Sequence, residues 1–252
     1  RHLQALGRIH DDHEARRAIE SAARTFDNVN LDLMYSLPGQ SLEEALQDAR
    51  EAISWNTAHL SFYHLTIEPE TVFHRRPPVI PDADAAAEIE DAVHGALAGA
   101  GFDQYETSAF ARESRRCRHN LNYWEFGDYL GLGAGAHSKL SFPDRIVRQA
   151  RTKQPREYLK RVAAREPVLE GRHLQRPDAV FEFMMNALRL TGGFPVALFQ
   201  ERTGLPLGAA ARALDAAEAR GLIERDHRTI RPSALGRRFL NDLLEIFLPE
   251  KC

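Results

Sequence analysis

A short stretch from Cys117 to Trp124 combines a thiol, an imidazole, two carboxamides and two amphipathic aromatic side chains. A glycine-rich run, from Gly131 to His137, follows closely and adds a second imidazole. Buried core segments favour aliphatic residues, and plain loops rarely combine His-Asn with Tyr-Trp. We interpret the stretch as the wall of a ligand pocket.

The two histidines are the candidate metal ligands or acid–base groups of this region. His119 and His137 carry imidazoles that titrate or ligate near neutral pH, although a structural role is the competing interpretation for each. Cys117 with His119 is too sparse for a structural zinc site, which needs four ligands. Cys252, at the end of the chain, is expected to be inert.

Asp32 and the glycines add a second set of candidates. Asp32 lies in the middle of an expected strand with apolar neighbours, where a carboxylate needs a partner. That partner is either a ligand or an arginine or backbone amide, and spacing alone favours neither. Gly131, Gly133 and Gly135 let a backbone approach a ligand closely, but tight strand packing is the alternative. Their spacing is not the dinucleotide-binding fingerprint.

Composition excludes several classes of protein. The 252 residues are 43% hydrophobic and 27% charged, with a formal net charge of −3, so no basic excess indicates a nucleic-acid partner. No apolar run reaches the roughly 18 residues of a membrane span. Two cysteines make no disulfide framework, and we expect a reducing, cytoplasmic location. Because the chain begins at Arg1, we also expect it to be the C-terminal part of a longer protein.

Alternating helix and strand patterns fill the first 110 residues. Asp11 and Ser41, each followed by glutamate three residues later, begin helices as capping boxes. The remaining patterns predict a helix over 82–98 and strands over 29–35, 59–67 and 104–110. Strands separated by helices indicate parallel βα units. Because the first strand carries polar residues on one face, we expect a partial barrel with a polar interior rather than an open sheet.

The pattern changes after about residue 150. The sequence predicts helices over 155–164, 177–190, 194–203 and 207–220, a hairpin around Asp226-His227, and a last helix from Ser233. This order is typical of a winged-helix domain. DNA binding is the obvious alternative function, but acidic residues nearly balance the arginines of this segment. We therefore predict domains over 1–150 and 151–252, the second a packing or substrate-lid module.

Four segments together resemble a known family. They are NLDLMYSLPGQ (30–40), YETSAFA (105–111), HNLNYW (119–124) and YLGLGAGAHS (129–138). They are similar to the radical S-adenosylmethionine family of oxygen-independent coproporphyrinogen III oxidases, and most similar to its HemW-like haem-chaperone branch. The resemblance implies an α/β fold, in which the second half of a radical S-adenosylmethionine partial (β/α) barrel precedes a mostly helical, winged-helix-like C-terminal domain.

The resemblance also implies roles for particular residues. Arg8 resembles the arginine that holds the cofactor carboxylate, and Asp32 resembles the strand aspartate that contacts S-adenosylmethionine. Thr66, with the run that includes Gly133, Gly135 and His137, would line the same pocket. His119 resembles the haem-linked histidine of the chaperone branch and is the candidate haem-iron ligand. No catalytic residue is assigned.

One feature of the family is absent. Its [4Fe-4S] cluster is held by three cysteines in a C-x3-C-x2-C loop, and this chain has only two cysteines in all. The chain alone is therefore expected to be non-catalytic, with cluster and S-adenosylmethionine bound by the longer protein.

Three functions are compared on this basis. The leading hypothesis is a haem chaperone that binds haem or a related porphyrin and delivers it to acceptor haemoproteins. The alternatives are an oxygen-independent coproporphyrinogen III oxidase of porphyrin biosynthesis and a winged-helix regulator. Neither nucleic acid nor an integral membrane segment is expected, and peripheral membrane contact is left open.

Overall fold

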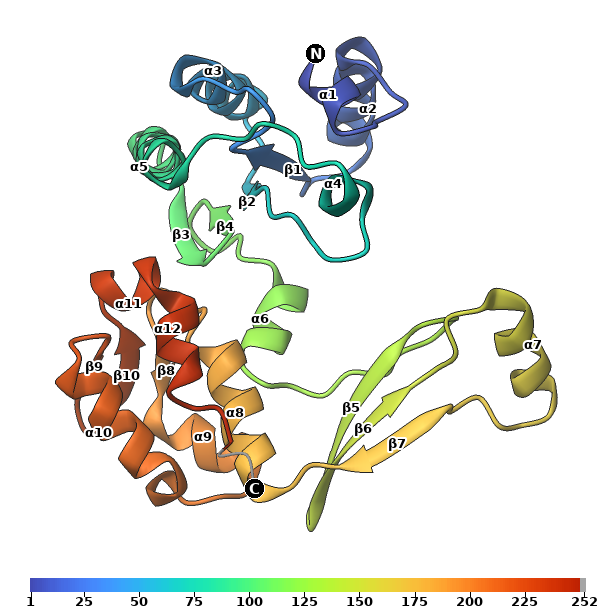
Figure 1. Ribbon diagram of the computed structural model, residues 1–252, viewed down its shortest axis with the longest axis vertical. Helices are drawn as coiled ribbons and strands as arrows, with labels where there is room; N and C mark the ends of the chain where they lie inside the picture. Colours follow the sequence, from blue (N-terminus) through green and yellow to red (C-terminus); the bar gives the residue numbers. More distant parts are fainter. Residues whose placement is uncertain (250–252) are drawn as a thin grey trace. The chain divides into compact units, whose positions relative to one another are not determined.

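The chain forms two compact units, residues 1–117 and 118–252, and the computed structural model describes residues 1–249 (Figure 1). Cys252 lies outside the described residues. The predicted domain boundary at residue 150 falls inside the second unit, at the end of a strand. The boundary at residue 150 stays a prediction, because the two compact units are defined by contacts within this chain and do not test the boundaries of its domains.

The first unit contains a four-stranded sheet in the order β1-β2-β4-β3. Its strands are β1 (Asn30–Tyr35), β2 (His59–His64), β3 (Asp103–Glu106) and β4 (Ala109–Ala111). β1 and β2 are parallel, which confirms one predicted βα unit. β4 is antiparallel to both β2 and β3, so β3 has the same direction as β1 and β2 but is separated from β2 by β4. The expectation of a single strand over 104–110 was wrong. That segment turns back after Glu106 and forms two strands instead of one.

Five helices accompany this sheet in the first unit. They are α1 (His2–Ala5), α2 (Asp12–Thr25), α3 (Leu42–Ser54), α4 (Val72–Arg75) and α5 (Ala83–Gly99). Both predicted capping boxes are present, at Asp11 and at Ser41. α3 and α5 pack together against one face of the sheet (Figure 1). Alternation along the strands therefore divides β1 and β2 into a core face and a polar face.

The core of the first unit confirms this division. Leu31 and Tyr35 of β1 and Leu60 and Phe62 of β2 are buried among residues of α3 and α5. Asn30 and Asp32, which alternate with the core residues, occupy the opposite face. Asn30 is paired in register with His59, and Asp32 with Ser61. The strand parity thus places these polar side chains together.

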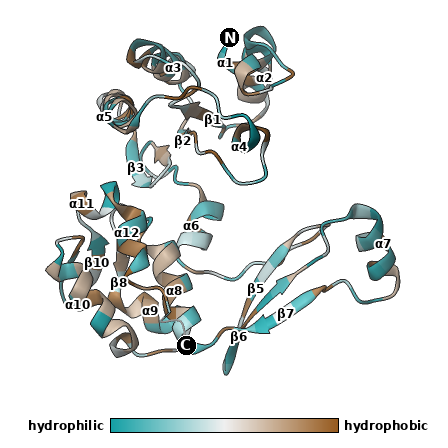
Figure 2. Cartoon of the chain, in the orientation of Figure 1, coloured by the Kyte–Doolittle hydropathy of each residue, from teal (hydrophilic) through white to brown (hydrophobic). Residues whose placement is uncertain are grey.

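The second unit begins with α6 (Arg118–Trp124) and a three-stranded antiparallel sheet that the sequence did not predict. Its strands, in spatial order, are β5 (His137–Phe142), β6 (Arg145–Ala150) and β7 (Glu170–His173). The predicted helix near residue 155 is confirmed as α7 (Pro155–Ala163), between β6 and β7. This sheet and α7 are mainly hydrophilic (Figure 2).

The rest of the second unit is winged-helix-like. The elements are α8 (Arg176–Ala187), β8 (Phe194–Pro195), α9 (Val196–Thr203), the 3-10 helix η1 (Leu207–Ala210), α10 (Ala211–Ala219), β9 (Ile223–Arg225), β10 (Thr229–Pro232), α11 (Ala234–Arg238) and α12 (Leu240–Glu245). β8, β10 and β9 form the small sheet, and the hairpin at Asp226-His227 is confirmed. Phe183 lies at the centre of the core, edge-to-face with Phe126, Phe194 and Phe199.

Two details of this segment differ from the predictions. Phe194 and Pro195 begin the small sheet rather than a helix. The expected single last helix is interrupted at Phe239, whose backbone is non-helical, and forms α11 and α12. Leu235 and Phe239 are about half exposed, whereas Leu243 and Phe247 are buried. Because of this interruption, the apolar residues of α12 pack into the core, whereas Leu235 and Phe239 remain at the surface.

No helix within residues 1–249 combines the length and the apolar composition needed to cross a lipid bilayer.

Candidate functional site

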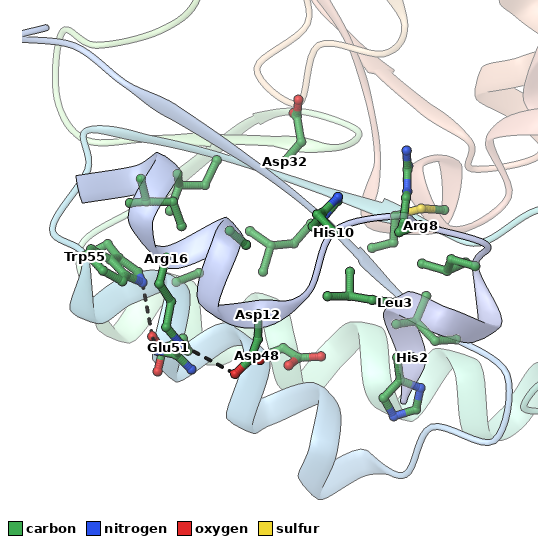
Figure 3. A pocket seen from close by; sticks show the side chains of 18 of the residues that line it. His2, Leu3, Arg8, His10, Asp12, Arg16, Asp32, Asp48, Glu51 and Trp55 are labelled. Carbon is green, nitrogen blue, oxygen red and sulfur yellow. Dashed lines mark hydrogen bonds and ion pairs between the residues drawn. The ribbon is translucent and has the colours of Figure 1, made fainter. Parts of the chain in front are cut away.

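A pocket of about 570 Å³ lies beside β1 in the first unit (Figure 3). It is lined by α1, α2 and the segment between them, by β1, and by one side of α3. Arg8 and Asp32 both line it, and in Figure 3 both side chains extend away from α3. The structure therefore brings together two of the predicted cofactor-binding residues.

The Asp32 carboxylate is exposed and accepts a hydrogen bond from the Asn30 amide, with 2.9 Å between Asn30 Nδ2 and Asp32 Oδ1. Neither an arginine nor a backbone amide is its partner within residues 1–249. The premise that this carboxylate is buried was wrong, because the polar face of β1 is open. Asp32 remains available to a ligand.

Arg8 presents a guanidinium without a protein partner. The side chain is exposed and pairs with no carboxylate of the part of the chain that the structure describes. Its backbone N–H donates to the Leu3 carbonyl, 2.9 Å away, which fixes the turn after α1. Such a planar, unpaired group suits two-point recognition of a ligand carboxylate.

Thr66 follows β2 and does not line this pocket. Its hydroxyl donates to the Glu68 carboxylate, with 3.0 Å between the oxygens. The predicted role of Thr66 in cofactor binding stays a prediction.

His119 lies in the first turn of α6 in the second unit and is exposed. Its ring packs edge-to-face on Tyr123, with centroids 4.8 Å apart, and Tyr123 in turn contacts Tyr129 at 4.5 Å. The imidazole nitrogens have no hydrogen-bond partner within residues 1–249. The pocket wall expected between Cys117 and Trp124 is thus a helix with one free imidazole beside aromatic rings.

A buried lysine holds the chain after α6 against β5. Lys139 Nζ donates to the Phe126 carbonyl at 2.8 Å and pairs with Asp128 at 3.0 Å. Burial lowers the pKa of Lys139, while the Asp128 carboxylate opposes that shift. Asp128 also accepts from Ser141 N–H, 2.8 Å away. These contacts fix the loop that follows α6 and leads to Tyr129.

The glycine run forms the loop that precedes β5, and glycine is required at its positions for two different reasons. A Cβ on Gly131 would lie 2.0 Å from the His137 carbonyl oxygen, so this glycine permits a close backbone approach. Gly133 and Gly135 have φ of +102° and +73°, which favour glycine whatever the space around them. Gly133 N–H donates to the Tyr158 hydroxyl of α7 at 3.2 Å. At Gly131 the packing alternative is therefore confirmed.

His137 is exposed at the start of β5 and lines a second pocket, of about 780 Å³. Tyr129, Arg148, Arg172 and Glu182 line the same pocket. Arg148 donates to the Tyr129 hydroxyl at 2.6 Å, and Glu182 pairs with Arg148 at 2.6 Å and with Arg172 at 2.9 Å. The carboxylate therefore neutralises much of the positive charge of the two arginines.

Sequence reasoning missed the groups that support these candidates. Tyr129, Arg148 and Glu182 are distant in sequence, and no motif links them. His59 and Tyr105 continue the hydrogen bonding behind Asp32. That His59 faces Asn30 follows only from the register of β1 and β2, which the sequence alone did not provide.

Within residues 1–249, no group of three or more histidine, cysteine, aspartate or glutamate side chains could hold a metal ion. Cys117 is free and partly buried.

The fold and the site define a class: an α/β protein with a pocket beside its first parallel strand that combines an apolar lining with the charged groups of Arg8 and Asp32, and with a winged-helix-like module in its second unit. Residues 174–239 match the family described as the HemN C-terminal domain. A solved structure titled as coproporphyrinogen III oxidase (HemN) from Escherichia coli, a radical SAM enzyme, superposes with a TM-score of 0.76. It is 18% identical and the match covers 97% of this chain and 60% of that one, which shows the fold.

Curated relatives narrow the class further. The chain is 47% identical over 98% of its length to a protein named heme chaperone HemW from Escherichia coli. It is 45% identical over 99% of its length to the HemW of Haemophilus influenzae, and 29% identical to that of Bacillus subtilis. The chain spans 65% of the first relative and 64% of the second. The chain is thus similar to HemW proteins along nearly its whole length, and its C-terminal part matches the HemN C-terminal domain.

Proposed function

We propose that this chain carries the haem-binding segment and part of the S-adenosylmethionine pocket of a haem chaperone. The haem is cargo, taken up near His119 and passed to acceptor haemoproteins. The names of the relatives at 29–47% identity support this function over others. A cytoplasmic location remains part of the proposal.

The observation that carries the proposal is that His119 is exposed and that its ring nitrogens are not hydrogen-bonded within residues 1–249. An axial ligand to haem iron needs a neutral imidazole nitrogen with a free lone pair and space for the porphyrin. His119 is exposed, its nitrogens are not engaged by the described part of the chain, and the Tyr123 ring lies 4.8 Å from it, centroid to centroid. The donor and its surroundings therefore fit haem.

The residues beside β1 fit S-adenosylmethionine. The free guanidinium of Arg8 would hold the ligand carboxylate, and the Asp32 carboxylate would accept hydrogen bonds from the ligand. Thr66, Gly133, Gly135 and His137 keep their proposed places in cofactor binding from the resemblance alone. When bound, the cofactor would supply a sulfonium group and a nucleoside.

The [4Fe-4S] cluster does not fit this chain. Three thiolates cannot come from a sequence that holds two cysteines, and residues 1–249 contain no alternative metal cluster. We assign the cluster to the longer protein and derive no step through it.

The oxidase remains the alternative, and only the fold supports it, because the HemN structure is 18% identical.

Haem titration of the chain, followed in the Soret band, tests the proposal. We expect a shifted, saturable Soret band and affinity for metal-free protoporphyrin IX at least about tenfold weaker, because the imidazole–iron bond is missing. The absence of a shift, or equal affinity for the two porphyrins, would contradict it. Conversion of coproporphyrinogen III to protoporphyrinogen IX by the complete protein would favour the oxidase.

A further inference from the structure

A continuous line of hydrogen bonds runs from the Asp32 carboxylate into the interior of the first unit. Asn30 Nδ2 donates to Asp32 Oδ1 at 2.9 Å, and Asn30 Oδ1 lies 2.6 Å from His59 Nδ1. His59 Nε2 lies 2.8 Å from the Tyr105 hydroxyl, which accepts from Cys117 N–H at 3.3 Å. We call Asp32, Asn30, His59 and Tyr105 the relay.

Donor and acceptor chemistry gives the relay one direction. The amide oxygen of Asn30 can only accept, so His59 Nδ1 carries the hydrogen. Ser61 Oγ donates to the same amide oxygen at 3.1 Å, which fixes the orientation of the amide. The remaining nitrogen of a neutral His59 then accepts from the Tyr105 hydroxyl. Each donor therefore points towards Asp32.

Burial makes the relay rigid. His59 is 4% exposed and Tyr105 is 2% exposed, and their rings pack edge-to-face with centroids 5.6 Å apart. The parallel register sets His59 directly beside Asn30. Burial lowers the pKa of His59, and the nearby Asp32 carboxylate opposes this, so the imidazole is neutral at neutral pH. Asp32 and Asn30 line the open pocket, whereas His59 and Tyr105 lie behind them and do not.

We propose that His59, acting through Asn30, is a positioning residue that holds the Asp32 carboxylate in the orientation required by its ligand. This inference rests on the proposed role of Asp32 in binding S-adenosylmethionine. An exposed aspartate alone would sample several rotamers, and fixing one of them before binding lowers the entropic cost of binding. His59 and Tyr105 supply that order through Asn30, from buried positions that do not line the pocket.

The test is the affinity of the complete protein for S-adenosylmethionine, measured by calorimetry. We expect His59→Leu to weaken binding about 3- to 10-fold, the range for one lost hydrogen bond. His59→Gln should restore affinity to within about twofold, because its amide can both donate to Asn30 and accept from Tyr105. A purely structural role would not distinguish the two variants by their hydrogen bonding.

His94→Leu is the matched control. His94 is a half-buried histidine on α5 that packs against Phe110, ring centroids 5.0 Å apart, on the core face of the same sheet. It has no part in the relay, so its replacement should leave affinity unchanged. If His59→Leu does not fold, Tyr105→Phe removes the relay's hydroxyl alone and should weaken binding in the same direction.

A double-mutant cycle separates this inference from the proposed function. With Asp32→Asn, binding should weaken, and adding His59→Leu should then have little further effect. Unchanged affinity in Asp32→Asn would overturn the role of Asp32 itself. Weaker binding in Asp32→Asn together with wild-type affinity in both His59→Leu and Tyr105→Phe would overturn the relay alone.

Discussion

At the scale of single residues, the first unit contains two histidines that burial keeps neutral. His59 lies on the polar face of the sheet and is hydrogen-bonded at both nitrogens, whereas His94 lies on the core face against aromatic rings. Burial lowers the pKa of both; the Asp32 charge opposes this for His59, and the Glu90 and Asp91 charges oppose it for His94. Each histidine therefore links protonation to unfolding.

The sign of this linkage gives a prediction for stability against pH. In the unfolded chain a histidine titrates at about 6.5, above the lowered folded-state values, so the unfolded state binds more protons as the pH falls. The free energy of unfolding should be greatest above about pH 6.5 and decrease below it. Urea unfolding at pH 7.5 and 5.5 measures this.

Comparing the pH dependence of the unfolding free energy between the unaltered chain and histidine variants separates the contributions of His59 and His94 from those of other titrating groups. His59→Gln and His94→Gln should each reduce the decrease in unfolding free energy between the two pH values. An unchanged pH dependence in both variants would contradict the assignment of buried, neutral imidazoles.

At the scale of elements, local sequence predicted most helices because their signals are local. The capping boxes at Asp11 and Ser41 and the strand parity of β1 needed only neighbouring residues. The split of 104–110 into β3 and β4 could not be predicted in this way, since pairing with β2 decides it. The antiparallel sheet from β5 to β7 depends equally on non-local pairing.

The residues of the candidate site also fall into those predictable from local sequence and those that depend on non-local pairing. Asp32 and His119 could be named from motifs, but the open polar face beside Asp32 and the support from His59 required strand register. Tyr129 and Arg148 meet only in the folded second unit, so spacing gave no signal for them.

The glycine run offers a prediction at this scale. Gly131→Ala places a methyl group against the His137 carbonyl oxygen, which we expect to cost about 1–3 kcal/mol of unfolding free energy through overpacking. Gly192→Ala, also in the second unit, meets nothing within 4 Å and is the control. Urea unfolding of the two variants should separate them, and equal stability would show that the loop at Gly131 yields easily.

At the scale of the molecule, the two units have separate cores. One consists of residues between Leu31 and Phe110, and the other of residues between Phe126 and Phe247. Of the candidate S-adenosylmethionine residues, Arg8, Asp32 and Thr66 belong to the first unit, whereas Gly133, Gly135 and His137 belong to the second, as does His119. Haem titration is therefore carried out without S-adenosylmethionine, so that cofactor binding at the second-unit residues does not contribute to the signal.

The most direct measurement is haem titration of three single variants of the chain, with the Soret maximum as readout. The account predicts that His119→Ala loses the imidazole-ligated Soret shift, or weakens haem binding at least about tenfold. His173→Ala, an exposed histidine of β7 outside the motif, should bind as the unaltered chain does. His137→Ala reports whether a second imidazole contributes. An unchanged Soret shift and affinity in His119→Ala would contradict the central claim.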